Sequence, residues 1–155
     1  METEKSIVFD SGPIISLATN NLLWILEPLK KAFDGEFYIT PAVYREVIEK
    51  PLTTKKYKFE ALQVYPIIKN NILRIKEEKE AKLHAEELLE LANTLFNVSG
   101  NWMRILHFAE VEVIATALAV DATTVVIDER TTRHLIEAPE RIPKHLEREL
   151  ELPVQ

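Results

Sequence analysis

Apolar residues along the chain form short continuous runs that alternate with longer helical stripes. The run Ser6-Ile-Val-Phe9 predicts a buried strand that ends directly before Asp10. Similar runs at 37–39, 72–75 and 123–127 predict three further strands, and the last of them ends at Asp128. The chain therefore places a carboxylate after its first strand and another after its last.

The stretches between and after these strands have the marks of helices. Ser11-Gly-Pro13 supplies a capping residue and a proline suited to a first helical turn, and Thr40-Pro41 repeats that signal. The predicted helices are 14–18, 22–33, 42–50 (stopping before Pro51), a weak one at 59–66, 77–97 with Leu83, Leu88, Leu89 and Leu91 on its inner side, a buried one at 109–120, one ending at Ala138, and 142–150.

Alternating strands and helices predict an α/β fold. We expect a three-layer α/β/α sandwich around a mostly parallel sheet of about four or five strands. The 155 residues suit a single domain over 1–155, because no linker or composition shift suggests a second one. A last edge strand would start near Pro153, where the chain ends, so either the chain is a fragment of a longer protein or the sheet is short.

Composition narrows the classes of function. The chain has no cysteine, which excludes cysteine-based zinc sites, iron–sulfur clusters, thiol nucleophiles and disulfide scaffolds. No apolar stretch is long enough for a signal peptide or a membrane helix, so we expect a cytoplasmic protein without membrane contact. The net charge of −6 argues against binding nucleic acid by bulk positive charge, but it allows an acidic site filled by a divalent cation.

Four acidic residues are expected at one edge of the sheet. Asp10 and Asp128 follow strands, and sites in open α/β sheets form at the carboxyl ends of strands. Glu110 lies in the first turn of the helix before the last strand, and Glu46 flanks the apolar stripe of its own helix. Carboxylates gathered this way repel one another unless a cation intervenes, and oxygen-only ligands suit Mg²⁺ or Mn²⁺. Such a site can activate water for attack on a phosphodiester.

The segments around these acids resemble a known family. Val8-Phe-Asp10-Ser-Gly12, Ile39-Thr-Pro-Ala-Val-Tyr-Arg-Glu46-Val, Ala109-Glu110-Val-Glu-Val-Ile-Ala115 and Val125-Val-Ile-Asp128-Glu-Arg130 look like the four acidic motifs of PIN-domain ribonucleases. They occur in the family's order and cover most of the chain.

The resemblance implies a metal-dependent endoribonuclease acting on single-stranded or structured RNA, with Asp10, Glu46, Glu110 and Asp128 as metal-binding catalytic acids. Its relatives include toxins of toxin–antitoxin pairs and archaeal RNA-processing nucleases. It therefore also implies a homodimer and an antitoxin or RNA-processing partner.

Several neighbouring residues have more than one interpretation. Glu112 competes with Glu110 for the third position, and only one of them can enter the site, because residues two apart point to opposite sides of a helix. We choose Glu110 because it lies one turn before Ile114, on the face that continues to Ala117. Ser11 could orient the Asp10 carboxylate or only cap a helix. Arg130 and Arg133 could contact RNA phosphates or be solvated at a helix start, and the basic stretch 55–58 could contact RNA or be a charged loop.

Two functions of other classes compete with the nuclease. The first is a PIN-fold binding or scaffold module in an RNA-processing complex that no longer cleaves. The second is a phosphoryl-transfer domain of the receiver or haloacid-dehalogenase type, which also places Asp after a strand. The dehalogenase pattern requires a second Asp two residues after Asp10, where this chain has Gly12.

Overall fold

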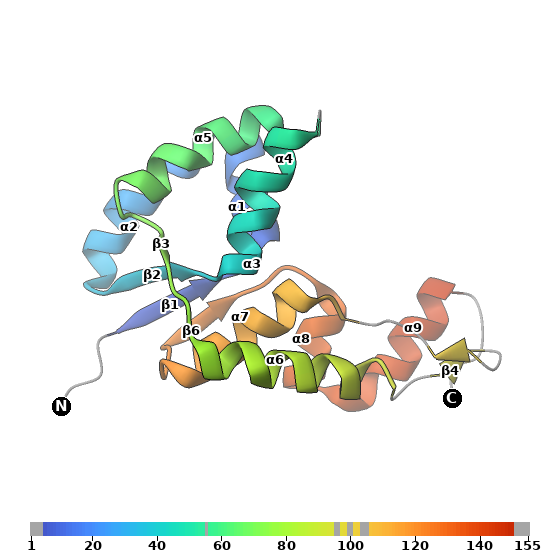
Figure 1. Cartoon of the computed structure of the whole chain (residues 1–155). Helices are drawn as coiled ribbons and strands as arrows, with labels where there is room; N and C mark the ends of the chain where they lie inside the picture. The colour runs from blue at the N-terminus through green and yellow to red at the C-terminus, as the bar shows by residue number, and fades with distance from the viewer. Residues whose placement is uncertain (1–4, 55, 95–96, 99–100, 103–105, 151–155) are drawn as a thin grey trace.

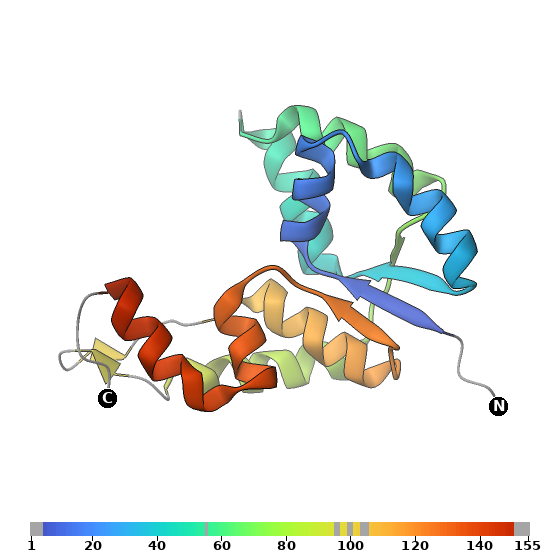
Figure 2. The ribbon, with the colours of Figure 1, turned by 180° about the vertical axis from the view of Figure 1, so that it is seen from behind.

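The computed structural model describes residues 5–54, 56–94, 97–98, 101–102 and 106–150. Its central sheet contains four parallel strands in the order β3-β2-β1-β6. Their bounds are β1 (Ser6–Phe9), β2 (Glu36–Ile39), β3 (Arg74–Ile75) and β6 (Thr124–Val126). Helices cover both faces of this sheet (Figures 1 and 2), so the predicted three-layer α/β/α fold with a parallel sheet is confirmed.

The first half of the chain covers one face of the sheet. The elements there are α1 (Ser11–Thr19), η1 (Leu23–Ile25), α2 (Leu26–Phe33), α3 (Pro41–Tyr44), η2 (Arg45–Glu49), α4 (Lys50–Thr53) and α5 (Lys58–Lys69). Val8, Phe37 and Ile39 of the strands are fully buried beneath them, together with Val43 and Val64 of the helices. The apolar residues of β1 and β2 expected from the sequence therefore lie in the main core, whereas Ile75 of β3 is 45% exposed and β6 is only partly buried.

The second half covers the other face. Its helical elements are α6 (Lys79–Ala92), α7 (Phe108–Ala119), α8 (Arg130–Glu137), η3 (Pro139–Arg141) and α9 (Ile142–Leu150). Helix α7 packs on β1 and β6 and also on α6, so it is buried on two sides. A smaller core forms where α6, α7 and α9 meet, around Ala85, Val111, Ala115, Ile142 and Leu146.

Two proline positions differ from the prediction. The helix expected to stop before Pro51 continues to Thr53, through a π-helical turn at Arg45–Glu49. Pro51 lies in the first turn of α4, where a missing N–H is tolerated. Likewise α5 passes through Pro66 and ends at Lys69, because its buried residues Ala61 and Val64 anchor it to the core. At Pro66, tertiary packing outweighs the local helix-breaking tendency.

The helix predicted for 77–97 ends earlier. Helix α6 stops at Ala92, and the side chain of Asn93 bridges to Leu106, accepting from its N–H at 3.2 Å and donating to its carbonyl at 3.4 Å. The chain then forms a short hairpin of β4 (Asn97–Val98) and β5 (Asn101–Trp102). The edge strand expected near Pro153 falls outside the described residues.

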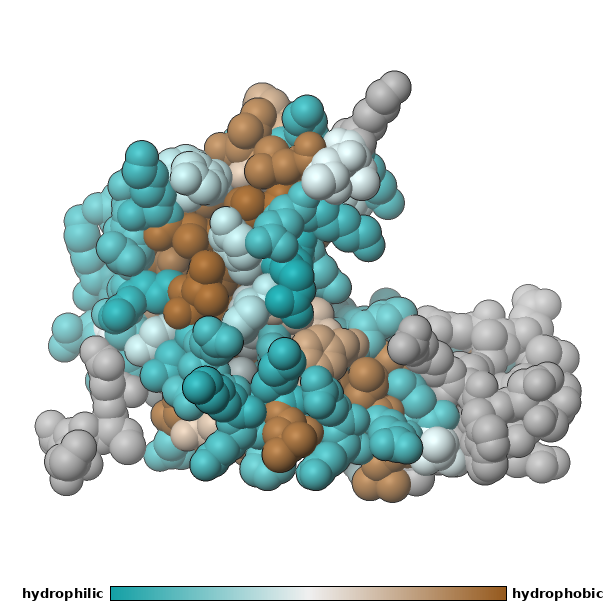
Figure 3. Space-filling model, in the orientation of Figure 1, coloured by the Kyte–Doolittle hydropathy of each residue, from teal (hydrophilic) through white to brown (hydrophobic). Residues whose placement is uncertain are grey.

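The inner side of α6 was also predicted wrongly. Leu83, Leu88 and Leu91 are 56%, 43% and 59% exposed, and only Leu89 is partly buried. The buried positions are Ala81 and Ala85, one turn apart, because small side chains allow α6 to lie close against α7. Figure 3 shows the resulting brown apolar patches among teal residues over the α6 layer.

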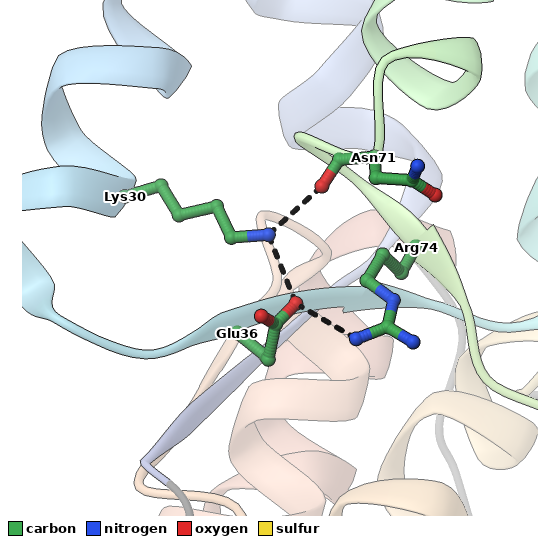
Figure 4. A network of polar contacts seen from close by, with 4 residues as sticks. All are labelled: Lys30, Glu36, Asn71 and Arg74. Carbon is green, nitrogen blue, oxygen red and sulfur yellow. Dashed lines mark hydrogen bonds and ion pairs between the residues drawn. The ribbon is translucent and has the colours of Figure 1, made fainter.

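A polar network closes the sheet edge away from the carboxyl ends of the strands. Lys30 Nζ donates to Glu36 at 2.9 Å and to the Asn71 carbonyl at 2.8 Å, and Arg74 lies 3.5 Å from the same carboxylate (Figure 4). The network ties α2 to the starts of β2 and β3. Within the part of the chain that the structure describes, no helix has the length and apolarity needed to cross a bilayer.

Candidate active site

Asp10 lies at the carboxyl ends of two neighbouring strands, β1 and β6. Phe9 pairs with Val126 in the parallel register, and the Asp10 N–H donates to the Val126 carbonyl at 3.0 Å. This bond fixes the Asp10 backbone beside the end of β6, and Asp128 follows two residues later. The structure therefore brings the first and fourth predicted acids to the same sheet edge, as the strand order requires.

The Asp10 carboxylate is buried without a cationic partner among the described residues. It is 4% exposed, and its Oδ1 atom has no hydrogen-bond partner. Burial raises the pKa of Asp10 to about 6; the Ser11 N–H opposes this rise, and the charges of Glu110, Glu46 and Asp128 add to it. The three other predicted acids thus lie close enough for their charges to act on Asp10.

Gly12 makes room for the fourth acid. A Cβ atom at this position would lie 2.6 Å from Asp128 Cγ and would collide with its carboxylate oxygens. Because real Cβ atoms do not approach so closely, any larger residue would displace Asp128. This role could not be predicted from the sequence, since a glycine before a proline also suits a helix start.

Glu46 reaches the site from a widened helical turn. It lies in the π-helical segment Arg45–Glu49, while Val47 and Ile48 beside it are buried in the core. π-helical turns are uncommon and frequently occur at functional sites. Glu46 is half-buried and lines two neighbouring surface hollows, so it flanks the buried face as the sequence predicted.

The two competing glutamates of α7 have different partners. Glu110 Oε2 accepts from the His107 N–H at 3.0 Å and from Thr132 Oγ1 at 3.2 Å. Glu112 is 3% exposed and accepts from the Ala42 N–H at 2.9 Å, so it caps the start of α3. Of these two glutamates, Glu110 is the one whose charge raises the pKa of Asp10.

The sequence profile described as the PIN domain matches residues 6–139, which include all four strands of the central sheet and all four acids. The chain belongs to the PIN-domain family. Searches of curated proteins and of solved structures gave no match. PIN domains are generally nucleases and typically use divalent metal ions, so this PIN domain has a nuclease-type fold.

The acids of this PIN domain supply the oxygen ligands that a divalent cation prefers, but their side chains do not converge on one point. Among the described residues, no three acidic or histidine side chains converge closely enough to form a metal-binding group. Mg²⁺, however, commonly takes only one or two carboxylates and completes its shell with waters and substrate oxygens. The buried, unpartnered Oδ1 of Asp10 is an oxygen that such an ion would satisfy.

A fifth acid belongs to the same edge and was missed. Glu129 caps α8, accepts from the Thr132 N–H at 2.6 Å, and its charge acts on Glu110. Burial is the largest influence on Glu110 and raises its pKa, although the His107 N–H opposes the rise. For Glu129, burial is outweighed by hydrogen bonds from Thr132 and Thr131, which lower its pKa. An acid directly after Asp128 is indistinguishable from a simple cap in the sequence.

The other predicted site residues have weaker positions. Ser11 lines a hollow beside Glu46, and its backbone N–H acts to lower the pKa of Asp10. Arg133 is exposed and lies 3.5 Å from Glu137, one helical turn away. Arg130 is exposed at the start of α8. RNA binding by Arg130 and Arg133 stays a prediction.

Proposed function

We propose that this PIN domain is a divalent-metal-dependent endoribonuclease that cleaves phosphodiesters in single-stranded RNA. One observation carries the proposal. A buried carboxylate with an unpartnered oxygen, Asp10, lies in the field of three further acids at the carboxyl ends of two parallel strands. Repulsion among these carboxylates destabilises the metal-free protein, and a bound cation would offset that repulsion.

Each acid has a distinct part in this proposal. Asp10 and Asp128 would hold Mg²⁺ or Mn²⁺, with Glu110 held in place by the His107 N–H and the Thr132 hydroxyl. A bound ion of this kind lowers the pKa of water and stabilises charge on phosphate oxygens. Glu46, on the rim, would accept the proton of the attacking water at its carboxylate. Gly12 keeps the Asp128 carboxylate at the edge.

The test is cleavage of mixed labelled single-stranded RNAs with Mg²⁺ or Mn²⁺, and with EDTA as the metal-free control. Asp10→Asn keeps the side-chain shape and removes the charge, so it should abolish metal-dependent cuts. Asp34→Asn is the matched control, because Asp34 is exposed and follows α2 away from the acids. Equal cleavage by wild type and Asp10→Asn would overturn the proposal.

Two biological roles fit this activity, and they predict different partners. As a toxin, the protein would form a homodimer and be blocked by a small antitoxin covering the acids. As an RNA-processing nuclease, it would co-purify with RNA or with processing proteins. Affinity purification followed by mass spectrometry and RNA sequencing distinguishes the two.

The alternative is a PIN-fold scaffold that binds without cleaving. The observation that favours it is the open geometry of the acids, since no described group of three converges on one point. A scaffold predicts that Mn²⁺ binding does not depend on Asp10, which calorimetry measures directly.

A further inference from the structure

Two surface hollows lie on either side of Glu46. The first, of about 240 Å³, lies between α1 and the segment joining α4 to α5, and its lining includes Ser11, Lys50, Thr54, Lys56 and Tyr57. The second, of about 370 Å³, shares Glu46 and Lys50 and is completed by Arg45, His107 and Phe108. The two hollows therefore border the acid edge and continue one another.

The cations of these hollows have no acidic partner. Arg45, Lys50 and Lys56 lack an ion pair among the described residues, whereas Lys30 and Arg74 at the other end of the sheet share Glu36. These three cations lie beside Glu46 and next to the acid edge, so positive and negative side chains are neighbours here without forming an ion pair among the described residues. This arrangement suits a nucleic acid strand. One phosphate would lie at the metal ion held by the acids, and the phosphates on either side of it would contact these cations.

Tyr57 adds an aromatic face to the first hollow. Its backbone adopts φ 60° and ψ 18°, a left-handed conformation that is unfavourable for a bulky residue. The ring is 39% exposed, and Lys56 Nζ lies 4.9 Å from its centroid. Glycine or asparagine would adopt this backbone at lower cost, and strained backbone positions of this kind cluster at binding sites.

We propose that the first hollow is a nucleotide subsite of the RNA strand, next to the bond that is cut. A base stacks on Tyr57, and the adjoining phosphates contact Lys50 and Lys56. The strand then passes Glu46 into the second hollow, where Arg45 meets the next phosphate. This inference rests on the proposed nuclease function and names the residues that hold its substrate. Aromatic stacking between backbone-binding cations is the usual way that proteins bind single strands.

Binding is measured separately from cleavage, by fluorescence anisotropy of a labelled ten-nucleotide RNA with the Asp10→Asn protein. In that background, Tyr57→Ala should weaken binding about tenfold and Tyr57→Phe should leave it unchanged, because stacking requires the ring. Lys56→Gln should weaken binding and make its salt dependence shallower, since one phosphate contact is lost.

Matched controls come from α5, the helix that begins directly after Tyr57. Phe59→Ala removes an exposed aromatic side chain and Lys69→Gln removes an exposed cation, and both lie outside the two hollows. Neither should change RNA binding. Tyr57→Asn should lose affinity while its melting temperature stays the same or rises, because the left-handed backbone suits asparagine. That combination separates a binding role from a structural one.

The results distinguish the two proposals. If Tyr57→Ala and Lys56→Gln bind RNA as tightly as their background, or if Phe59→Ala loses as much affinity, the subsite is wrong even when the wild type cleaves RNA. If the two variants weaken binding but the wild type makes no metal-dependent cuts, the subsite stands and the nuclease proposal fails.

Discussion

Two carboxylates at opposite ends of neighbouring strands have opposite surroundings. Glu36 begins β2 and is held by Lys30 and Arg74 (Figure 4). Burial alone would raise the pKa of Glu36, but the hydrogen bond and charge of Lys30, together with Arg74, hold it below its usual value. Asp10 follows β1, is more deeply buried, and has acids around it where Glu36 has cations.

The difference separates carboxylates that stabilise this fold from those available for chemistry. At the Glu36 end, each charged group has an oppositely charged partner within the protein, so no external ion is needed to compensate the charges. At the Asp10 end, repulsion and burial remain uncompensated until a cation binds. Perturbed groups of this kind concentrate at functional sites.

The largest expected effect is on stability without metal at pH 7. Asp10→Asn should stabilise the protein by up to about 3 kcal/mol, because about 1.4 kcal/mol corresponds to each unit of raised pKa. Glu36→Gln should destabilise it by about 1 to 2 kcal/mol, because Lys30 loses a charged partner. Urea unfolding of both variants in EDTA measures this contrast, and a loss of stability in Asp10→Asn would contradict it.

The pH dependence should have opposite signs at the two ends. The Asp10 contribution is fully present below its unfolded pKa near 3.8 and is lost as pH rises through about 6. The Glu36 contribution is present above its unfolded pKa and is lost as pH falls through its lowered pKa. The free energy of unfolding should be measured from pH 3 to 8. In Asp10→Asn it should no longer decrease as pH rises above 4, and in Glu36→Gln its decrease at acid pH should be smaller than in the wild type.

A smaller effect is expected from the glycine that faces Asp128. Gly12→Ala should reduce cleavage and Mn²⁺ affinity about ten- to hundredfold, because the new Cβ displaces the Asp128 carboxylate. Asp128 is exposed and can rotate away, so the protein should remain folded. The melting temperature provides the control. Unchanged cleavage would show that the position of Asp128 does not matter.

The smallest effect distinguishes the two glutamates of α7. Glu112→Gln should cost about 1 kcal/mol of stability, because it weakens the charged bond to the Ala42 N–H, and should leave cleavage per folded molecule unchanged. Glu110→Gln should lower Mn²⁺ affinity with little loss of stability, since glutamine still accepts from His107. The reverse pattern would make Glu112 the site residue.

The sequence predicted the sheet and the order of the acids well. Asp10 and Asp128 were found because short apolar runs end at them, and parallel strands bring such ends together. It failed where packing decides. The exposure of Leu83 and Leu88 depends on alanines meeting α7, and the helix through Pro51 depends on a π-helical turn.

The missed parts of the site depend on contacts between distant segments. Gly12 matters because Asp128 arrives against it, and Glu129 matters because its charge acts on Glu110. Neither contact has a local pattern. The sequence did indicate that only one of Glu110 and Glu112 enters the site, because residues two apart on a helix face opposite sides. The choice of Glu110 stays a prediction.

The most direct measurement is calorimetric titration of Mn²⁺ into the metal-free protein at pH 7, using wild type, Asp10→Asn and Glu36→Gln. We expect saturable binding by the wild type and by Glu36→Gln, and at least tenfold weaker binding by Asp10→Asn. Equal binding by the wild type and Asp10→Asn, or no binding by the folded wild type, would contradict a cation site at Asp10.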